Sequence, residues 1–166
     1  MRQIDPHTLT CAPFAMFDDD WALLTAGDDK SCNTMTVSWG GMGILWGMPV
    51  TFVVVRPTRH TYGFIESLDR YTLTFFKGEE KRAALNLCGS KSGRDMDKIA
   101  AAGLRPVYGE GVTWFEDAAQ VYICRKLYCQ DIAPANMLDP AIDRNYPAKD
   151  YHRMYIGEIE NLLVAD

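Results

Sequence analysis

The feature that most constrains the fold is the close spacing of apolar, β-branched and aromatic segments. Residues 50–55 are apolar on both faces and end where Pro57 biases Arg56 away from helical dihedrals, as expected of a central strand. Residues 71–76 alternate aromatic and hydroxyl side chains, which is also typical of a strand. Most such segments follow one another too closely for a helical crossover, so the sequence favours antiparallel pairing.

The same criteria predict four further strands and three short helices. The strands are residues 21–26, 34–39, 119–130 and 152–163, and the third is long enough to be two strands that share a bulge. The helices are residues 61–68, 79–87 and 93–102, the last with Ser92 as N-cap and Asp95 as its capping-box partner. The absence of a G-x-G-x-x-G motif argues against a Rossmann fold. We therefore expect a single domain over residues 1–166, a mainly β fold in which peripheral helices surround a β-barrel.

Composition limits the partners of this domain. The formal net charge of -5 argues against a nucleic-acid or anionic-membrane surface. The five cysteines are odd in number and form no C-x-x-C pair, which favours free thiols in a reducing cytoplasm and no metal centre. No apolar run reaches the length of a membrane span, and no N-terminal signal pattern is present, so we expect a soluble protein. The acidic run at residues 18–20 lacks a calcium-loop spacing and is expected to be solvated.

Basic and hydroxyl residues gather at two junctions that precede predicted helices. They are Arg56, Arg59 and Thr61 at the first junction, and Lys91, Ser92 and Arg94 at the second. Backbone N–H groups at a helix start, together with Arg, Lys and hydroxyl donors, are the groups that bind a phosphomonoester. Alternatively, the arginines are surface cations and Ser92 is only a helix cap. The presence of two such junctions favours an anion site.

Three further features bear on a ligand site or a subunit interface. Asn33 and Thr36 could form hydrogen bonds to the edge of a heteroaromatic ring, and Trp39 could provide a flat apolar wall for its face. A redox ring needs both kinds of contact, because polar contacts and the exclusion of water set its potential. The alternative is a polar turn followed by a core tryptophan. His152 opens the last strand, although an isolated histidine is more often structural than catalytic. Residues 40–49 are Gly-rich yet carry a cluster of large apolar side chains, Ile44, Leu45 and Trp46. They predict a buried loop, folded over the barrel or placed at an interface with a second subunit.

Five stretches of this chain, in the right order, resemble the flavin reductase-like family with the FMN-binding split-barrel fold, and its flavoredoxin-like branch in particular. They are residues 33–40 (NTMTVSWG), 56–61 (RPTRHT), 90–98 (SKSGRDMDK), 124–128 (CRKLY) and 150–159 (DYHRMYIGEI). The resemblance runs from about Trp21 to the C-terminus, which makes it more specific than one short motif.

The resemblance implies a homodimer with one FMN per subunit near the interface. The residues that would line the isoalloxazine ring are Asn33, Met35, Thr36, Ser38 and Trp39. Those that would hold the phosphate and ribityl chain are Arg56, Arg59, Thr61, Lys91, Ser92, Arg94 and Lys98. His152 would lie near the flavin or an incoming nicotinamide, and is the candidate catalytic residue. Residues 133–150, with three prolines, are expected to shape the cleft.

The activity implied by the family is electron transfer through FMN. Reducing equivalents would pass from NADH, NADPH or a protein donor to a small-molecule or protein redox partner. The alternative is a non-catalytic flavin-binding or electron-carrier module of the flavoredoxin type, which does not itself oxidise NADH or NADPH. Hydride chemistry at a flavin requires no nucleophilic side chain, and no Ser-His-Asp arrangement is visible in the sequence.

Overall fold

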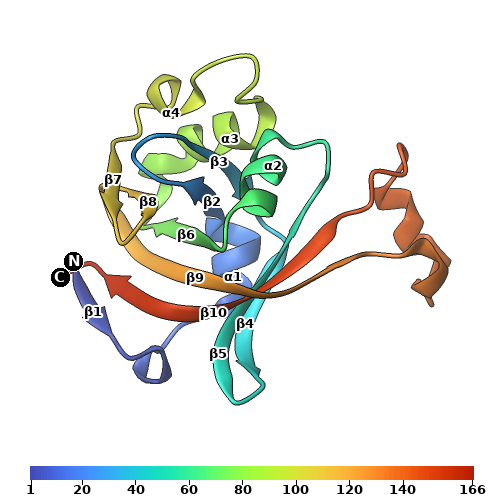
Figure 1. Ribbon diagram of the computed structural model, residues 1–166, viewed down its shortest axis with the longest axis horizontal. Coiled ribbons are helices and arrows are strands. Elements are labelled where there is room, and N and C mark those ends of the chain that lie inside the picture. The colour runs from blue at the N-terminus through green and yellow to red at the C-terminus, as the bar shows by residue number, and fades with distance from the viewer.

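A computed structural model describes residues 1–166, which fold around a curved antiparallel sheet (Figure 1). Its strands are β1 (Arg2–Ile4), β2 (Ala22–Gly27), β3 (Cys32–Val37), β4 (Gly40–Leu45), β5 (Met48–Val55), β6 (Arg70–Phe76), β9 (Ala118–Asp131) and β10 (Arg153–Val164). They are ordered β3-β2-β6-β9-β10-β5-β4, with β1 also paired to β10. β7 (Pro106–Gly109) and β8 (Val112–Phe115) form a separate hairpin. The predicted mainly β architecture is confirmed.

The helices are short and lie around the sheet (Figure 1). The α-helices are α1 (Pro13–Ala15), α2 (His60–Ser67), α3 (Arg82–Ser90) and α4 (Lys98–Ala101). Four short 3₁₀-helices are η1 (Pro6–Thr8), η3 (Glu79–Lys81), η4 (Pro134–Asn136) and η5 (Pro140–Asn145). A π-helix, η2 (Met16–Asp20), follows α1. Helices α2 and α3 both contact β2 and β3, so they cover the end of the sheet at which β3 is the edge strand.

The hydrophobic core lies inside the curve of the sheet. Fully buried side chains from five different strands meet there: Leu24, Val53, Leu73, Tyr122 and Leu162. Along β5 the burial alternates, because Val53 and Val55 point into the core while Phe52 is exposed. The central strand predicted at residues 50–55 is confirmed, because β5 pairs with both β10 and β4, although its apolar Phe52 is exposed.

The sheet does not close into a continuous barrel. β3 is hydrogen-bonded to β2 only and β4 to β5 only, so the two ends of the strand order remain separate. An edge strand leaves one row of its backbone N–H and C=O groups without a neighbouring strand. We call the opening between β3 and β5 the split.

Residues 40–49 form most of a β-hairpin and not the predicted loop. β4 and β5 are joined at Trp46 and Gly47, whose φ values of 52° and 74° are both positive. Two positive φ angles match the type I′ turn, which preserves the twist of the flanking strands. The hairpin projects from the barrel (Figure 1), and Ile44 and Trp46 at its tip are 63% and 57% exposed.

The predicted helix at residues 93–102 is wrong in its extent and its cap. Residues 91–97 form a loop, in which Ser92 Oγ accepts a hydrogen bond from the Arg94 N–H at 3.2 Å. α4 begins only at Lys98, because the Asp97 carboxylate accepts from Ala100 N at 3.1 Å and serves as the N-cap. The helix predicted at residues 79–87 continues to Ser90.

The cysteines are all free, and the strand that carries two of them is continuous. β9 spans the whole predicted segment 119–130, with register shifts against β10 that mark the expected irregularity. Cys124, on β9, is buried, whereas Cys129 on the same strand is exposed. No helix is long and apolar enough to cross a membrane. The structure contains no group of three or more His, Cys, Asp and Glu side chains placed to hold a metal ion.

Candidate functional site

A cavity of about 280 Å³ opens at the split. Its walls come from β3 and the turn after it, from β5 and the turn after it, and from the residue before β10. The lining residues are Met35, Thr36, Val37, Ser38, Trp39, Val54, Arg56, Arg59 and His152. All but Val37 and Val54 are residues that the sequence analysis assigns to the site. The split therefore brings together segments more than a hundred residues apart in the chain.

A second cavity, of about 560 Å³, takes in two other predicted residues, Asn33 and Lys98. It lies against the β2–β3 turn, the 91–97 loop, α4 and β7. Asn33 is buried under Gly93, where a Cβ atom would lie 2.4 Å from the Asn33 amide nitrogen. Asn33 thus supports the 91–97 loop and does not line the same cavity as Trp39.

Trp39 and His152 form one wall of the split cavity. Their ring centroids are 5.1 Å apart with the planes inclined at 49°. Trp39 is 47% exposed, so the alternative of a core tryptophan is wrong. His152 is only 8% exposed, and its Nδ1 lies 3.0 Å from Tyr146 Oη. Burial, together with the nearby positive charge of Arg56, lowers the pKa of His152 to about 4, so the imidazole is neutral near pH 7.

Arg56 is held by the segment at residues 133–150. Its Nη1 donates to Asp150 Oδ1 at 2.6 Å and its Nη2 to the Asn145 carbonyl at 2.9 Å. The guanidinium also lies over the Tyr146 ring, 5.0 Å from the centroid. The predicted cation thus lines the cavity while it anchors the 133–150 segment beside the split. That segment carries η4 and η5 and projects from the barrel at the right of Figure 1.

Arg59 and Lys98 both bind the C-terminal end of α3. Arg59 donates to the carbonyls of Gly89 at 2.6 Å and Cys88 at 3.0 Å. Lys98 Nζ donates to the carbonyls of Cys88 and Lys91, each at 3.3 Å. Cations are favoured there because the last carbonyls of a helix are unsatisfied and carry partial negative charge. Burial lowers the pKa of Lys98 to about 8 and also lowers that of Arg59.

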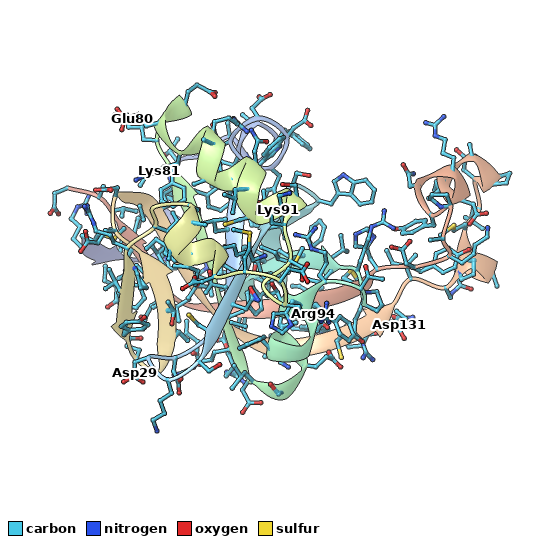
Figure 2. The ribbon with its side chains drawn as sticks, turned by 90° about the horizontal axis from the view of Figure 1, so that it is seen from above. Asp29, Glu80, Lys81, Lys91, Arg94 and Asp131 are labelled. Carbon is cyan, nitrogen blue, oxygen red and sulfur yellow. The ribbon has the colours of Figure 1, made fainter.

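The structure joins the two basic junctions into one surface. Arg94 Nη1 donates to the Thr58 carbonyl at 3.1 Å, which ties the 91–97 loop to the turn before α2. Lys91 lies at the end of α3 and Arg94 beside α2 (Figure 2). Both side chains are exposed, and Ser92 is half-buried between them. The two anion-binding junctions predicted from the sequence therefore lie next to each other.

Thr61 is the residue whose surroundings point most directly to a ligand. It is fully buried at the start of α2, and its Oγ1 has no hydrogen-bond partner. An unpaired buried hydroxyl destabilises a fold, and the first-turn N–H groups of a helix attract an anion. Arg59, which lines the split cavity, lies two residues away. A phosphate at the start of α2 would supply the partner that Thr61 Oγ1 lacks.

Thr36 and Met35 have structural partners as well. The Thr36 hydroxyl donates to the Leu85 carbonyl in α3, so it holds that helix against β3. Met35 belongs to the hydrophobic core and also lines the cavity. Three contributors were not predicted from the sequence: Val37, Val54 and Tyr146. Val54 could have been found from the alternation along β5, whereas Tyr146 had no local signal because its partner is set by the fold of residues 133–150.

The fold and the cavity define an FMN-binding split barrel. A family model described as "Flavin reductase like domain" matches residues 17–166, and the chain belongs to this family. A comparison with curated proteins gave no match.

Solved structures with the same fold come from bacteria and an archaeon. An FMN-binding protein from Thermus thermophilus with bound 1-cyclohex-2-enone is 20% identical, with a TM-score of 0.69 over 99% of this chain and 80% of that chain. The flavoredoxin of Desulfovibrio vulgaris (Miyazaki F) is 21% identical, with a TM-score of 0.67 over 100% of this chain and 77% of the other. The flavoredoxin from Methanosarcina acetivorans is 19% identical, with a TM-score of 0.66 over 100% and 76%.

The low pKa of His152 predicts a loss of stability in mild acid. An unfolded histidine takes up a proton near pH 6.5, but folded His152 does so only near pH 4. Between these values the unfolded state binds more protons, so the free energy of unfolding falls as the pH is lowered through this window and is unaffected above it. Urea denaturation should show a shallower fall for His152→Asn than for the native chain. A titration midpoint of 6.5 or above for His152, measured by NMR, would contradict the buried neutral ring.

Proposed function

We propose that this chain is an FMN-dependent oxidoreductase that passes reducing equivalents from NADH, NADPH or a protein donor to an acceptor. The observation that carries the proposal is the unpaired Thr61 hydroxyl at the start of α2, whose N-cap residue, Arg59, lines the cavity walled by Trp39 and His152. Membership of the flavin reductase-like family supports it. The free thiols of all five cysteines are compatible with a reducing cytoplasm, where we place the protein.

The residues present fit FMN in two parts. Thr61 and the first-turn N–H groups of α2 would hold the phosphate, with Lys91, Ser92 and Arg94 around it. The free edge of β3, with Ser38 and Trp39 after it, would receive the polar edge and the face of the ring. FMN, when bound, supplies the hydride-accepting and electron-transfer chemistry.

The side chains around the split cavity would do three things. Val37, Val54 and Trp39 exclude water from the site. Arg56 and Arg59 line the same cavity, and their fixed positive charge stabilises negative charge that develops there. His152 is neutral and contributes a hydrogen-bonding ring without adding charge.

A second candidate function is an electron carrier that receives electrons only from another protein. The structural likeness to two flavoredoxins favours this candidate. The two functions share the cofactor and differ in whether nicotinamide reduces it, so a donor experiment separates them.

We expect the purified chain to take up FMN and to turn yellow. Under anaerobic conditions, addition of NADH or NADPH should bleach the flavin absorption band rapidly if the chain is a reductase. Flavin that stays oxidised with both donors, but is bleached by a reduced protein donor, would favour the carrier. Failure to take up FMN would contradict both functions.

We expect Thr61→Val to separate stability from phosphate binding. Without FMN the substitution removes a buried unpaired hydroxyl, so the free energy of unfolding should stay the same or rise. FMN affinity, measured by fluorescence titration, should fall by about tenfold to a hundredfold, because a hydrogen bond to a charged group contributes about 1.5–3 kcal/mol. Riboflavin affinity should change little, since riboflavin lacks the phosphate.

Thr74→Val is a matched control for this experiment. Thr74 Oγ1 is also buried without a partner, but Thr74 lies within strand β6 and not at the start of a helix. Its substitution should leave the affinities of both flavins unchanged. Equal losses of FMN and riboflavin binding in Thr61→Val would contradict a phosphate contact. Arg59 is a poorer test because it also holds the end of α3.

We further propose that the chain is a homodimer through the β4–β5 hairpin. Ile44, Leu45 and Trp46 at its tip are exposed, and Phe52 on β5 extends the apolar surface. A two-fold partner of the same kind would bury this patch. Light scattering should give a dimer mass for the native chain and a monomer mass for Trp46→Asp. A native monomer with FMN bound would contradict the dimer.

A further inference from the structure

The segment at residues 133–150 brings one side chain onto His152. Tyr146 follows η5 and is only 3% exposed, although its neighbours Asn145 and Pro147 are exposed. Its hydroxyl lies 3.0 Å from Nδ1 of His152. The two rings meet edge to face, with centroids 5.5 Å apart and planes at 76°. Tyr146 is therefore the side chain that contacts His152 from this segment by both ring and hydroxyl.

The direction of this hydrogen bond follows from the groups that need a partner. The Tyr146 hydroxyl has no partner other than His152 Nδ1, so a bond in the opposite direction would leave the phenol proton buried and unpaired. A neutral imidazole carries one proton and accepts at its other nitrogen. We assign Tyr146 as the donor and Nδ1 as the acceptor, which places the imidazole proton on Nε2.

The proton on Nε2 is available to the cavity. His152 lines the split cavity, and Nε2 has no protein partner, while Nδ1 is engaged by Tyr146. The ring is held on its other side by Trp39, at 5.1 Å between centroids. An N–H group in this position can donate a hydrogen bond to an oxygen or nitrogen atom of whatever occupies the cavity.

Tyr146 is itself fixed by neighbours on both sides. The Arg56 guanidinium lies over its ring at 5.0 Å, and Arg56 is in turn paired with Asp150. The Tyr151 ring lies 4.9 Å from the Tyr146 ring, and the Tyr151 hydroxyl donates to Asp143. Arg56 and Asp150 are the charged groups that act on His152, and their effects on its protonation oppose each other.

We propose that Tyr146 is a positioning residue that sets His152 as a neutral hydrogen-bond donor toward the split cavity. The group that would receive the bond is an uncharged acceptor, such as a carbonyl oxygen or a ring nitrogen, because a neutral donor serves such atoms without requiring a counter-charge. The consequence for electron transfer rests on the proposed function; the assignment of the tautomer does not.

The tautomer is tested by ¹⁵N NMR of the histidine side chains in the chain without added flavin. The three histidines are distinguished by the loss of one set of signals in His152→Gln. We expect His152 to show an unprotonated Nδ1 and a protonated Nε2 near pH 7. In Tyr146→Phe the ratio of the two tautomers should shift by about fivefold or more toward Nδ1–H, as expected for the loss of one hydrogen bond.

Tyr151→Phe is the matched control. It removes the hydroxyl of the adjacent tyrosine, which binds Asp143 and does not touch His152, so the tautomer should remain Nε2–H. Thermal unfolding of both variants shows whether they are folded. A native Nδ1–H tautomer, or a folded Tyr146→Phe variant with the native tautomer, would overturn the proposal; a shift in both variants would show that the segment acts only through stability.

A double-mutant cycle tests the functional consequence in the FMN-loaded chain. The rate of flavin reduction by its active donor should fall in Tyr146→Phe and in His152→Gln, and Tyr146→Phe should have no further effect when His152 is already Gln. Additive losses would overturn the claim that Tyr146 acts through His152. If no donor reduces the native chain, the proposed function fails, but the NMR result still decides the positioning role.

Discussion

The rest of the structure depends on the failure of the sheet to close between β3 and β5. A closed barrel would pair the outer edge of β3 and fill the space beside it with side chains. Here β3 and β4 are the ends of the strand order, and the split between β3 and β5 holds the cavity lined by Met35, Trp39, Arg56 and His152. The same opening places the start of α2 at the margin of the cavity, because Arg59, the N-cap residue of α2, lines it. The split therefore brings together the wall formed by Trp39 and His152, the free edge of β3 and the N-terminus of α2.

Arg56, Arg59 and Lys98 form hydrogen bonds within the protein and also line the two cavities. Arg59 and Lys98 satisfy the last carbonyls of α3, and Arg56 anchors residues 133–150 through Asp150 and Asn145. These bonds hold the segments that border the cavity in place before any ligand arrives, which lowers the cost of organising the site. In the proposed FMN site the phosphate would therefore be bound by hydroxyl and backbone donors near Thr61, with the exposed Lys91 and Arg94 as the remaining positive charges. The neutral His152 lines the same cavity as Arg56 and Arg59, so an uncharged hydrogen-bonding ring and positive charges border it together.

Several predictions from the sequence hold because they depend on local chemistry. The strand at residues 71–76 and the long strand at residues 119–130 show their period and β-branched content directly, and the structure contains both. Other predictions are wrong because neighbours in space override the local signal. Ser92 resembles an N-cap, but Asp97 caps α4. Residues 40–49 resemble a Gly-rich loop, but pairing with β5 makes them a strand. In both cases the competing partner is known only once the chain has folded.

The sequence by itself determined the fold class and the identity of most residues at the split, since strand period, helix-start chemistry and five family-like stretches are all local patterns. Only the tertiary structure decided which of those residues share a cavity. Asn33 and Trp39 lie six residues apart on the chain yet line different cavities, and Tyr146 reaches His152 because residues 133–150 fold back on Arg56. The physical reason is that a side chain's hydrogen-bond partner and its burial depend on the register and closure of the sheet, which are set by packing across the whole chain.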